Sequence, residues 1–316
     1  MVDFRYHLVS IIAVFLALAV GIVLGTTALK GPVLDDLRDN IKRLSSDKRV
    51  LESEVGTLRG QVNVADDFAA TVGPGLVRGT LADQRVLLVT TPDTPADLVQ
   101  RVITLLGESG ASVTGQLRVL PTMSDPERAK VVEDLVAEVV PAGVDLPDGR
   151  TLDRATAELA AALATPARGK SVEISEAQAV VSAFEEADLV QFEGEGGTLR
   201  QATLAVVLSG PAPVGEPEDS QAEQREAVLS LAAALDERAR GTVVAGPATS
   251  ATDRGVVGAL RQDSSRAAEV SGVDNADRGV GQVAVVLALA EQARGGSGQY
   301  GAGPRATAPL PSSAAS

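Results

Sequence analysis

The sequence contains no cysteine, which excludes disulfide bonds, thiolate metal ligands and cysteine nucleophiles. Histidine is almost as scarce: His7 is the only one, so a Ser-His-Asp triad, a two-histidine metal site and a histidine general base are unavailable to the rest of the chain. The chain has only two methionines, Met1 and Met123, so it offers few soft side-chain ligands for Cu(I). We therefore expect no catalytic residues, no metal ligands and no cofactor, and we predict that the chain is not an enzyme.

Aromatic residues make up only 2% of the chain, which disfavours a lipid-facing β-barrel with aromatic girdles. The formal net charge is −14, so the chain has no field that would attract a phosphate backbone, and we expect no nucleic-acid partner. Apolar residues make up 45% of the 316 residues, enough to form a core. The excess negative charge follows residue 64, because the two segments before it are close to neutral.

Residues 6–29 form an uncharged apolar run of 24 residues, after an N-terminal tail at residues 1–5. As a helix this run is about 36 Å long, enough to cross a hydrocarbon core of about 30 Å. A cleaved signal peptide is the alternative, but the run exceeds the usual h-region of about 7–15 residues. The sequence therefore predicts a single-pass membrane protein with an uncleaved signal anchor. Basic residues flank both ends, so the loop charges do not set its orientation.

Small residues recur at every fourth position of this run and form one ridge: Ala13, Ala17, Gly21 and Gly25. A small-residue ridge lets two helix backbones approach closely in lipid. It predicts packing against a second membrane helix, although Ala and Gly are also common in membrane helices that have no such partner.

Residues 33–64 carry a heptad pattern that predicts a coiled-coil stalk, beginning after a break at Gly31-Pro32. Eight of its nine a and d positions are Leu, Ile or Val, and the exception is Lys48. A single polar a-position residue sets register or oligomeric state at a cost in stability. The predicted seam consists of Leu34, Leu37, Ile41, Leu44, Lys48, Leu51, Val55, Leu58 and Val62.

The charges beside the seam give a mixed code for a parallel dimer. Glu54 would face Arg59 of the second copy, whereas Asp47 would lie near Glu52. The alternative is an amphipathic helix packed on its own globular domain, which usually has a wider apolar face. We expect a parallel homodimer.

Residues 81–294 alternate apolar runs with amphipathic segments and predict an α/β globular domain with an open, mostly parallel sheet and flanking helices. The predicted strands are 86–91, 111–120, 189–192, 203–208, 242–246 and about 267–271. The predicted helices are 95–106, 126–140, 151–164, 176–187, 218–239, 252–261 and 276–293, the first capped by Thr94. Residues 295–316 are of low complexity and predict a disordered tail.

No dinucleotide or Walker motif accompanies these strands. Open parallel sheets often bind ligands beyond the carboxyl ends of their strands, at a switch point. The turn after residues 242–246 therefore suggests either an anion pocket or an ordinary turn and helix cap. Its polar residues and glycine are Gly246, Thr249, Ser250, Thr252 and Asp253.

Two weaker patterns have ordinary structural interpretations. The acidic pairs Asp66-Asp67 and Glu185-Glu186 could bind a hard cation, but such pairs are usually solvated. The glycines at 194, 196 and 197 favour a hairpin turn over a phosphate loop, because a strand follows them.

The opening FRYHLVSIIAVFLALAVGIVLGTTAL, followed by the heptad stalk and the α/β body, resembles the actinobacterial MctB-like copper transporter family, which includes SteB-like cell-envelope proteins. The resemblance covers residues 1 to about 294. It implies a membrane-anchored cell-envelope protein with an extracytoplasmic body. The copper branch implies copper homeostasis or a channel, and the SteB-like branch implies a coiled-coil partner protein.

No copper ligand set transfers from the family to this sequence, since Cys, His and Met are so scarce. One spanning helix per chain encloses a pore only if the chain oligomerises. We therefore expect a non-catalytic dimeric scaffold that recruits an envelope protein partner, with copper homeostasis or copper transport as the alternative.

Overall fold

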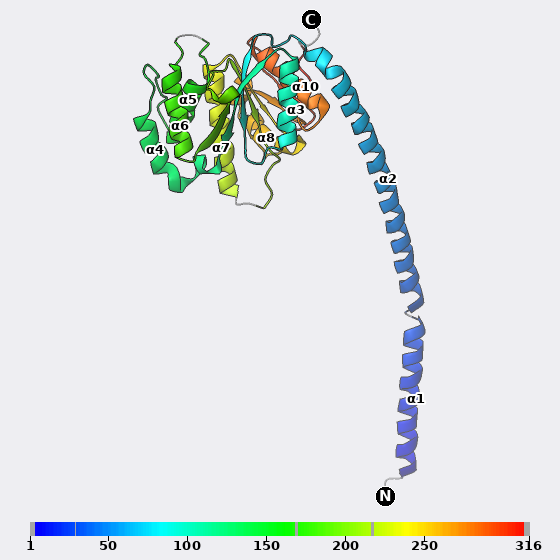
Figure 1. Cartoon of the computed structure of the whole chain (residues 1–316). Coiled ribbons are helices and arrows are strands. Elements are labelled where there is room, and N and C mark those ends of the chain that lie inside the picture. The colour runs from blue at the N-terminus through cyan, green and yellow to red at the C-terminus, as the bar shows by residue number, and fades with distance from the viewer. Residues whose placement is uncertain (1–3, 29, 168–169, 216–217, 313–316) are drawn as a thin grey trace. The chain divides into compact units, whose positions relative to one another are not determined.

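The computed structural model describes residues 4–28, 30–167, 170–215 and 218–312 (Figure 1). The chain divides into two compact units, Met1–Val64 and Ala65–Ser316. The first unit is helical and the second is an α/β body. Residues 1–3 of the predicted tail, Leu29 of the predicted span and residues 313–316 lie outside the described residues.

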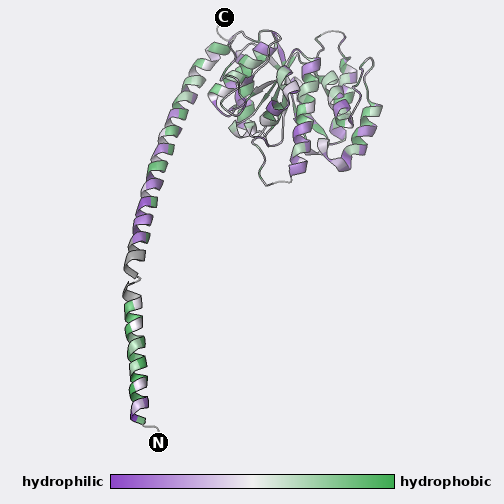
Figure 2. Ribbon diagram, turned by 180° about the vertical axis from the view of Figure 1, so that it is seen from behind, coloured by the Kyte–Doolittle hydropathy of each residue, from purple (hydrophilic) through white to green (hydrophobic). Residues whose placement is uncertain are grey.

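The first unit contains α1, Phe4–Ala28, and the greater part of α2, Lys30–Val77. Helix α1 begins within the segment predicted as a tail. It is hydrophobic along most of its length (Figure 2), and Phe4–Gly25 is the one span among the described helices that is long and apolar enough to cross a membrane. Pro32 lies in the first turn of α2, where a backbone N–H has no intrahelical acceptor and its loss is tolerated.

The second unit is built on a seven-stranded sheet with the order β3-β2-β1-β4-β5-β6-β7. All neighbouring strands are parallel except β3, which runs antiparallel to β2 at one edge. The strands are β1 Arg85–Thr90, β2 Ser112–Val119, β3 Val190–Gly194, β4 Leu204–Leu208, β5 Thr242–Ala245, β6 Ser271–Val273 and β7 Gln299–Tyr300. The predicted α/β class and mostly parallel sheet are confirmed.

Helices cover both faces of this sheet. The α-helices of the body are α3 Ala96–Glu108, α4 Ala129–Glu138, α5 Thr151–Leu163, α6 Ile174–Glu186, α7 Glu218–Arg238, α8 Val256–Gln262, α9 Ser264–Glu269 and α10 Gly279–Gln292. Short 3-10 turns are η1 Pro121–Ser124, η2 Pro126–Arg128, η3 Glu195–Gly197 and η4 Ala248–Ala251.

Alternation along the strands divides the core into two clusters. Val86 and Leu88 of β1 pack with α3 and α10 on one face. Leu87 and Val89 belong to the other cluster, with α5, α6, α7 and α8. Both faces of the central strands are therefore buried, which explains why β1, β4 and β5 appear in the sequence as continuous apolar runs.

The last residues of α2 belong to the body. Val77 is fully buried, and a Cβ added to Gly73 would lie 2.7 Å from Cγ2 of Val283 on α10. Oδ1 of Asp66 accepts a hydrogen bond of 3.0 Å from the backbone N–H of Gly279, the first residue of α10. The end of α2 is thus held by both apolar packing and a helix cap.

The predicted hairpin between residues 189 and 208 is wrong. Strand β3 pairs with β2, whereas β4 lies between β1 and β5, so β3 and β4 are not neighbours. Gly196 and Gly197 adopt positive φ angles of 63° and 76° in the turn that leaves the edge strand. The glycines do form a turn, as their sequence predicts, but local sequence does not specify which strands pair.

Two local boundaries also differ from the prediction. Residues 264–269 form α9 instead of a strand, because the Asp263 carboxylate caps the N–H groups of Ser265 and Arg266, and β6 follows at Ser271. Thr94 does not cap α3. Its hydroxyl donates to the Leu208 carbonyl at 2.8 Å and so joins the ends of β1 and β4.

The low-complexity segment predicted to be disordered is ordered over residues 295–312. It forms β7, in which Tyr300 is only 5% exposed. The buried Asp274 carboxylate accepts hydrogen bonds from the backbone N–H groups of Ala302 and Gly303, each 2.9 Å long, and pairs with Arg261 at 2.8 Å. Long-range bonds order a segment whose composition favours disorder.

Candidate functional site

The small-residue ridge predicted in the membrane segment lies on one helix. Ala13, Ala17, Gly21 and Gly25 are four residues apart within α1, a spacing that places them along one face. All four are exposed in the single chain, and a Cβ added at Gly21 or Gly25 would meet no atom within 4 Å. The face has room for a closely approaching helix.

The predicted seam lies on α2 and is open to solvent in the single chain. Its seven apolar members with described side chains are exposed by between 40% for Val62 and 72% for Leu44. Lys48 lies among them, with its Nζ 3.5 Å from Oε1 of Glu52. The side chain of Leu34 lies outside the described residues. The described apolar members are Leu37, Ile41, Leu44, Leu51, Val55, Leu58 and Val62.

A shallow groove runs along the middle of this seam. Leu44, Leu51 and Val55 form its apolar floor, and the stem of Lys48 lies beside them. An exposed apolar groove flanked by charged side chains has the form of a helix-packing surface.

One residue of each acidic pair predicted as a possible cation ligand has a structural partner, whereas Asp67 and Glu186 are exposed. Besides capping α10, Asp66 forms an ion pair of 3.2 Å with Arg278. Glu185 accepts a hydrogen bond of 2.8 Å from the backbone N–H of Phe192. Within the described residues, no three His, Cys, Asp or Glu side chains cluster as a metal site would require. Met123 is buried in the core.

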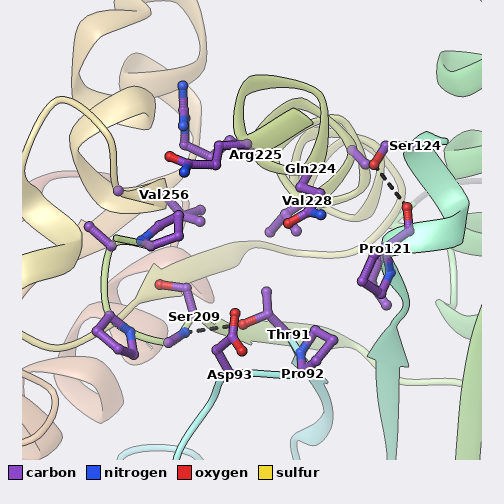
Figure 3. Close-up of a pocket in the computed structure, with 18 of the residues that line it drawn as sticks. Thr91, Pro92, Asp93, Pro121, Ser124, Ser209, Gln224, Arg225, Val228 and Val256 are labelled. Carbon is purple, nitrogen blue, oxygen red and sulfur yellow. Dashed lines mark hydrogen bonds between the residues drawn. The ribbon is translucent and has the colours of Figure 1, made fainter. Parts of the chain in front are cut away.

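A pocket lies at the carboxyl ends of β1, β2 and β4 (Figure 3). These strands are mutually parallel, so their carboxyl ends meet at one edge of the sheet. The chain moves from β1 to β2 in one direction and later places β4 on the other side of β1. The pocket therefore occupies the switch point of the sheet, where open α/β folds bind ligands. Its volume is about 150 Å³.

The floor of the pocket is fixed by contacts between β1 and β4. The backbone N–H of Gly210 donates to Oγ1 of Thr91 at 3.1 Å, as a dashed line shows in Figure 3. A Cβ at position 210 would lie 2.5 Å from the Asp93 carbonyl oxygen, so this close approach requires glycine. Prolines restrict the φ angles of the surrounding loops. They are Pro92, Pro121, Pro211 and Pro213.

Charged side chains line opposite sides of the pocket. In Figure 3, Arg225 extends from α7 toward Val256, the first residue of α8, while Thr91 and Asp93 lie across the pocket. The Arg225 guanidinium donates to the Arg254 carbonyl at 3.2 Å. Burial lowers the pKa of Arg225, and the neighbouring charge of Arg254 lowers it further, against the opposing effect of Glu218.

Neither Arg225 nor Arg254 forms a side-chain ion pair with any residue that the structure describes. Asp93 is exposed and likewise has no ion pair within that set. The pocket thus presents two cationic groups and one carboxylate whose charges are not neutralised by direct partners.

The turn considered from the sequence as an anion pocket is satisfied internally. The hydroxyl of Ser250 donates to the Pro247 carbonyl at 2.7 Å, and that of Thr252 donates to the Thr249 carbonyl at 2.8 Å. Asp253 pairs with Arg305 at 3.4 Å. The turn interpretation of residues 246–253 fits these bonds, and the pocket lies beside this turn. The general rule for open α/β sheets points to this edge of the sheet, and the residues that line the pocket come from loops far apart in the sequence.

Comparison with known proteins extends over nearly the whole chain. The family model described as "Copper transport outer membrane protein, MctB" matches residues 1–311. The chain is 31% identical over 310 residues to a protein named "Copper transporter MctB" from Mycobacterium tuberculosis strain H37Rv, covering 96% of this chain and 97% of that protein. It is 30% identical over 316 residues to the protein of the same name from Mycobacterium leprae, covering 97% and 98%.

Proposed function

The chain belongs to the MctB family, and from that premise we propose that it is a membrane-anchored, non-catalytic scaffold of the cell envelope. In this proposal α1 spans the membrane and the stalk forms a parallel homodimer. The α/β body lies outside the cytoplasm, where it recruits a protein partner. A cofactor and a nucleic acid have no part in the proposal.

The observation that carries this proposal is the open seam on α2. Its apolar side chains follow a strict 3-4 spacing, and none of the seven described ones is less than 40% exposed. The cores of the body bury their own leucines and valines almost completely. A second copy of the same helix would cover the seam by knobs-into-holes packing and remove its apolar surface from water.

Two further features support a parallel arrangement. The ridge at Ala13, Ala17, Gly21 and Gly25 precedes the seam on the same chain, so a membrane dimer would bring two stalks together in the same direction. Lys48 at an a position would disfavour higher oligomers at a cost in stability.

Copper transport is the second candidate, and the names of the family and of the relatives favour it. A channel would need several copies of α1 to surround a pore. It would also need copper ligands from a chain with one histidine, two methionines and no cysteine. The dimeric scaffold requires neither.

Cysteine crosslinking in membranes tests the stalk directly, because the native chain has no cysteine to interfere. Leu58→Cys places a thiol at a d position, which meets its own counterpart in a parallel, in-register dimer. Gly60→Cys places a thiol two residues away, at an f position on the opposite face. We expect mild oxidation to give a covalent dimer with Leu58→Cys and almost none with Gly60→Cys.

A second set of variants asks whether the seam causes the association. Leu44→Asp together with Leu51→Asp would bury unpaired carboxylates at two d positions and should abolish the crosslink at position 58. The matched control is Val50→Asp with Val64→Asp, two exposed valines at c positions, which should leave it intact. Equal crosslinking at positions 58 and 60, or a crosslink that survives the seam variants, would contradict the proposal.

Copper binding by the purified full-length chain separates the two candidate functions. The scaffold predicts that the purified full-length chain binds Cu(I) no better than an acidic control protein. Stoichiometric binding with submicromolar affinity, measured by calorimetry, would instead favour direct copper handling.

A further inference from the structure

We propose that the switch-point pocket binds a small anionic molecule that carries a phosphate or carboxylate at one end and a hydroxyl or ammonium donor at the other. This site is separate from the seam and the ridge, so it does not depend on dimerisation. The proposal rests on the position of the pocket, its rigid frame and the distribution of its charges.

The position indicates a ligand site. The loops that follow β1, β2 and β4 surround the pocket, and α7 forms one wall. At about 150 Å³ it is close in size to an engineered cavity that holds benzene, so it suits a ligand of about six to ten non-hydrogen atoms.

The frame is preorganised. The Gly210–Thr91 hydrogen bond and the close approach of Gly210 to Asp93 tie the two central loops together. Four prolines restrict the loops around them. A site whose loops are already fixed loses little conformational entropy when a small ligand binds.

The charges select the class of ligand. Arg225 donates to a single backbone carbonyl, that of Arg254, and its guanidinium has no ion pair with a described residue. An anionic group beside Arg225 and Arg254 would accept charge-assisted hydrogen bonds from them. Across the pocket, the Asp93 carboxylate can accept from a hydroxyl or an ammonium group but would repel a second anion.

Calorimetry on the full-length protein in detergent tests this proposal with three probes. These are sn-glycerol 3-phosphate, which has both features, inorganic phosphate, which has only the anion, and glycerol, which has neither charge nor phosphate. We expect saturable binding at one site per chain for glycerol 3-phosphate, weaker binding for phosphate and none for glycerol. Absence of binding by both phosphates, or equal binding of glycerol, would overturn the proposal.

Substitutions then assign the binding to this pocket. Arg225→Gln and Arg254→Gln should each weaken glycerol 3-phosphate binding by about tenfold or more. The matched control is Arg240→Gln, an exposed arginine just before β5 at the opposite end of the sheet, which should bind normally. If all three variants bind alike, the anion is bound elsewhere and the assignment fails.

Asp93→Ala tests the second half of the ligand. It removes repulsion toward any anion and also removes the acceptor for a hydroxyl. The preference for glycerol 3-phosphate over inorganic phosphate should therefore fall, whatever happens to either affinity alone. An unchanged preference would show that Asp93 does not contact the ligand, and the two-ended ligand class would be wrong.

Discussion

Helix α2 behaves differently on the two sides of residue 64. Before it, in the first unit, apolar side chains such as Leu44 and Leu51 are 72% and 60% exposed. After it, in the second unit, Val77 is fully buried and Asp66 caps another helix. The body buries its apolar side chains within one chain, whereas the apolar stripe of the stalk stays exposed among the described residues. This contrast supports a stalk that packs against another molecule and a body that is stable by itself.

The largest expected effect is a loss of stability of the body that leaves the stalk unaffected. Asp274→Ala removes the partner of Arg261 in an ion pair whose side chains are 1% and 0% exposed, and it also orphans two backbone N–H groups. An uncompensated buried charge should destabilise the body by about 3–5 kcal/mol. Chemical denaturation followed by tyrosine fluorescence and circular dichroism measures this loss.

The control for this variant is Asp253→Ala, which removes an exposed ion pair with Arg305. It should cost less than about 1 kcal/mol. Similar losses in the two variants would mean that the buried pair does not anchor the C-terminal segment.

A second prediction concerns pH and again affects the body. Burial raises the pKa of Glu158 to about 7, with Arg154 opposing the shift, and neither carboxyl oxygen has a hydrogen-bond partner among the described residues. The folded state therefore holds a proton that the unfolded state loses at about pH 4.5. The resulting stability is complete below about pH 4.5, is lost as pH rises to about 7, and stays lost above it.

Glu158→Gln removes this titration. The variant should be more stable than the wild type at pH 8, by up to about 3 kcal/mol, with little gain at pH 4.5. Glu108→Gln, on the exposed surface of α3, controls for the loss of one negative charge. Parallel stability curves for wild type and Glu158→Gln between pH 4.5 and 8 would contradict the prediction.

A third prediction addresses the docked end of α2. Asp66→Ala removes the acceptor for the first N–H of α10 and the ion pair with Arg278, and it should destabilise the body by about 1 kcal/mol. Its neighbour Asp67 is exposed, so Asp67→Ala should have almost no effect. Thermal unfolding of the two variants compares a docked and a solvated carboxylate on one helix.

The smallest expected effect compares a glycine-to-alanine substitution on the two sides of residue 64. Gly60→Ala meets no atom within 4 Å and should stabilise the stalk helix by about 1 kcal/mol, because alanine favours the helix. Gly73→Ala would place its methyl group 2.7 Å from Val283, so repacking should cancel the same gain. The melting temperature of the helix, followed by circular dichroism, should rise for Gly60→Ala alone. Equal rises for the two variants would contradict the difference between the stalk and the docked end of α2.

Sequence reasoning worked where a single segment determines its own structure. The central strands are apolar throughout because both of their faces are buried, and the uncharged apolar run predicted from the sequence forms α1, a helix long and apolar enough to cross a membrane. A general rule of α/β folds also points to the carboxyl ends of the strands, where the switch-point pocket lies.

Prediction failed where distant residues decide the outcome. The partner of β3 is β2, about 75 residues earlier, and no turn signal near Gly196 specifies that pairing. The C-terminal segment is ordered by Asp274 and Arg261, which low complexity could not reveal. The pocket is lined by Asp93 and Arg225, which come from a loop and a helix far apart in the chain, and only the strand order places them around one pocket.

The two-residue strand β7 also has a consequence for solubility. Without it, β6 would expose unpaired backbone groups at the edge of the sheet, where a strand of another molecule could add. The outer side of β7 is covered in turn by residues 307–308, because Thr307 N–H donates to the Gln299 carbonyl at 2.7 Å and Gly301 N–H donates to the Ala308 carbonyl at 3.0 Å. Gly301, with a φ of 128°, and Pro304 lie in the turn between β7 and this covering segment. The glycine- and proline-rich segment would thus protect the α/β body against edge-to-edge aggregation.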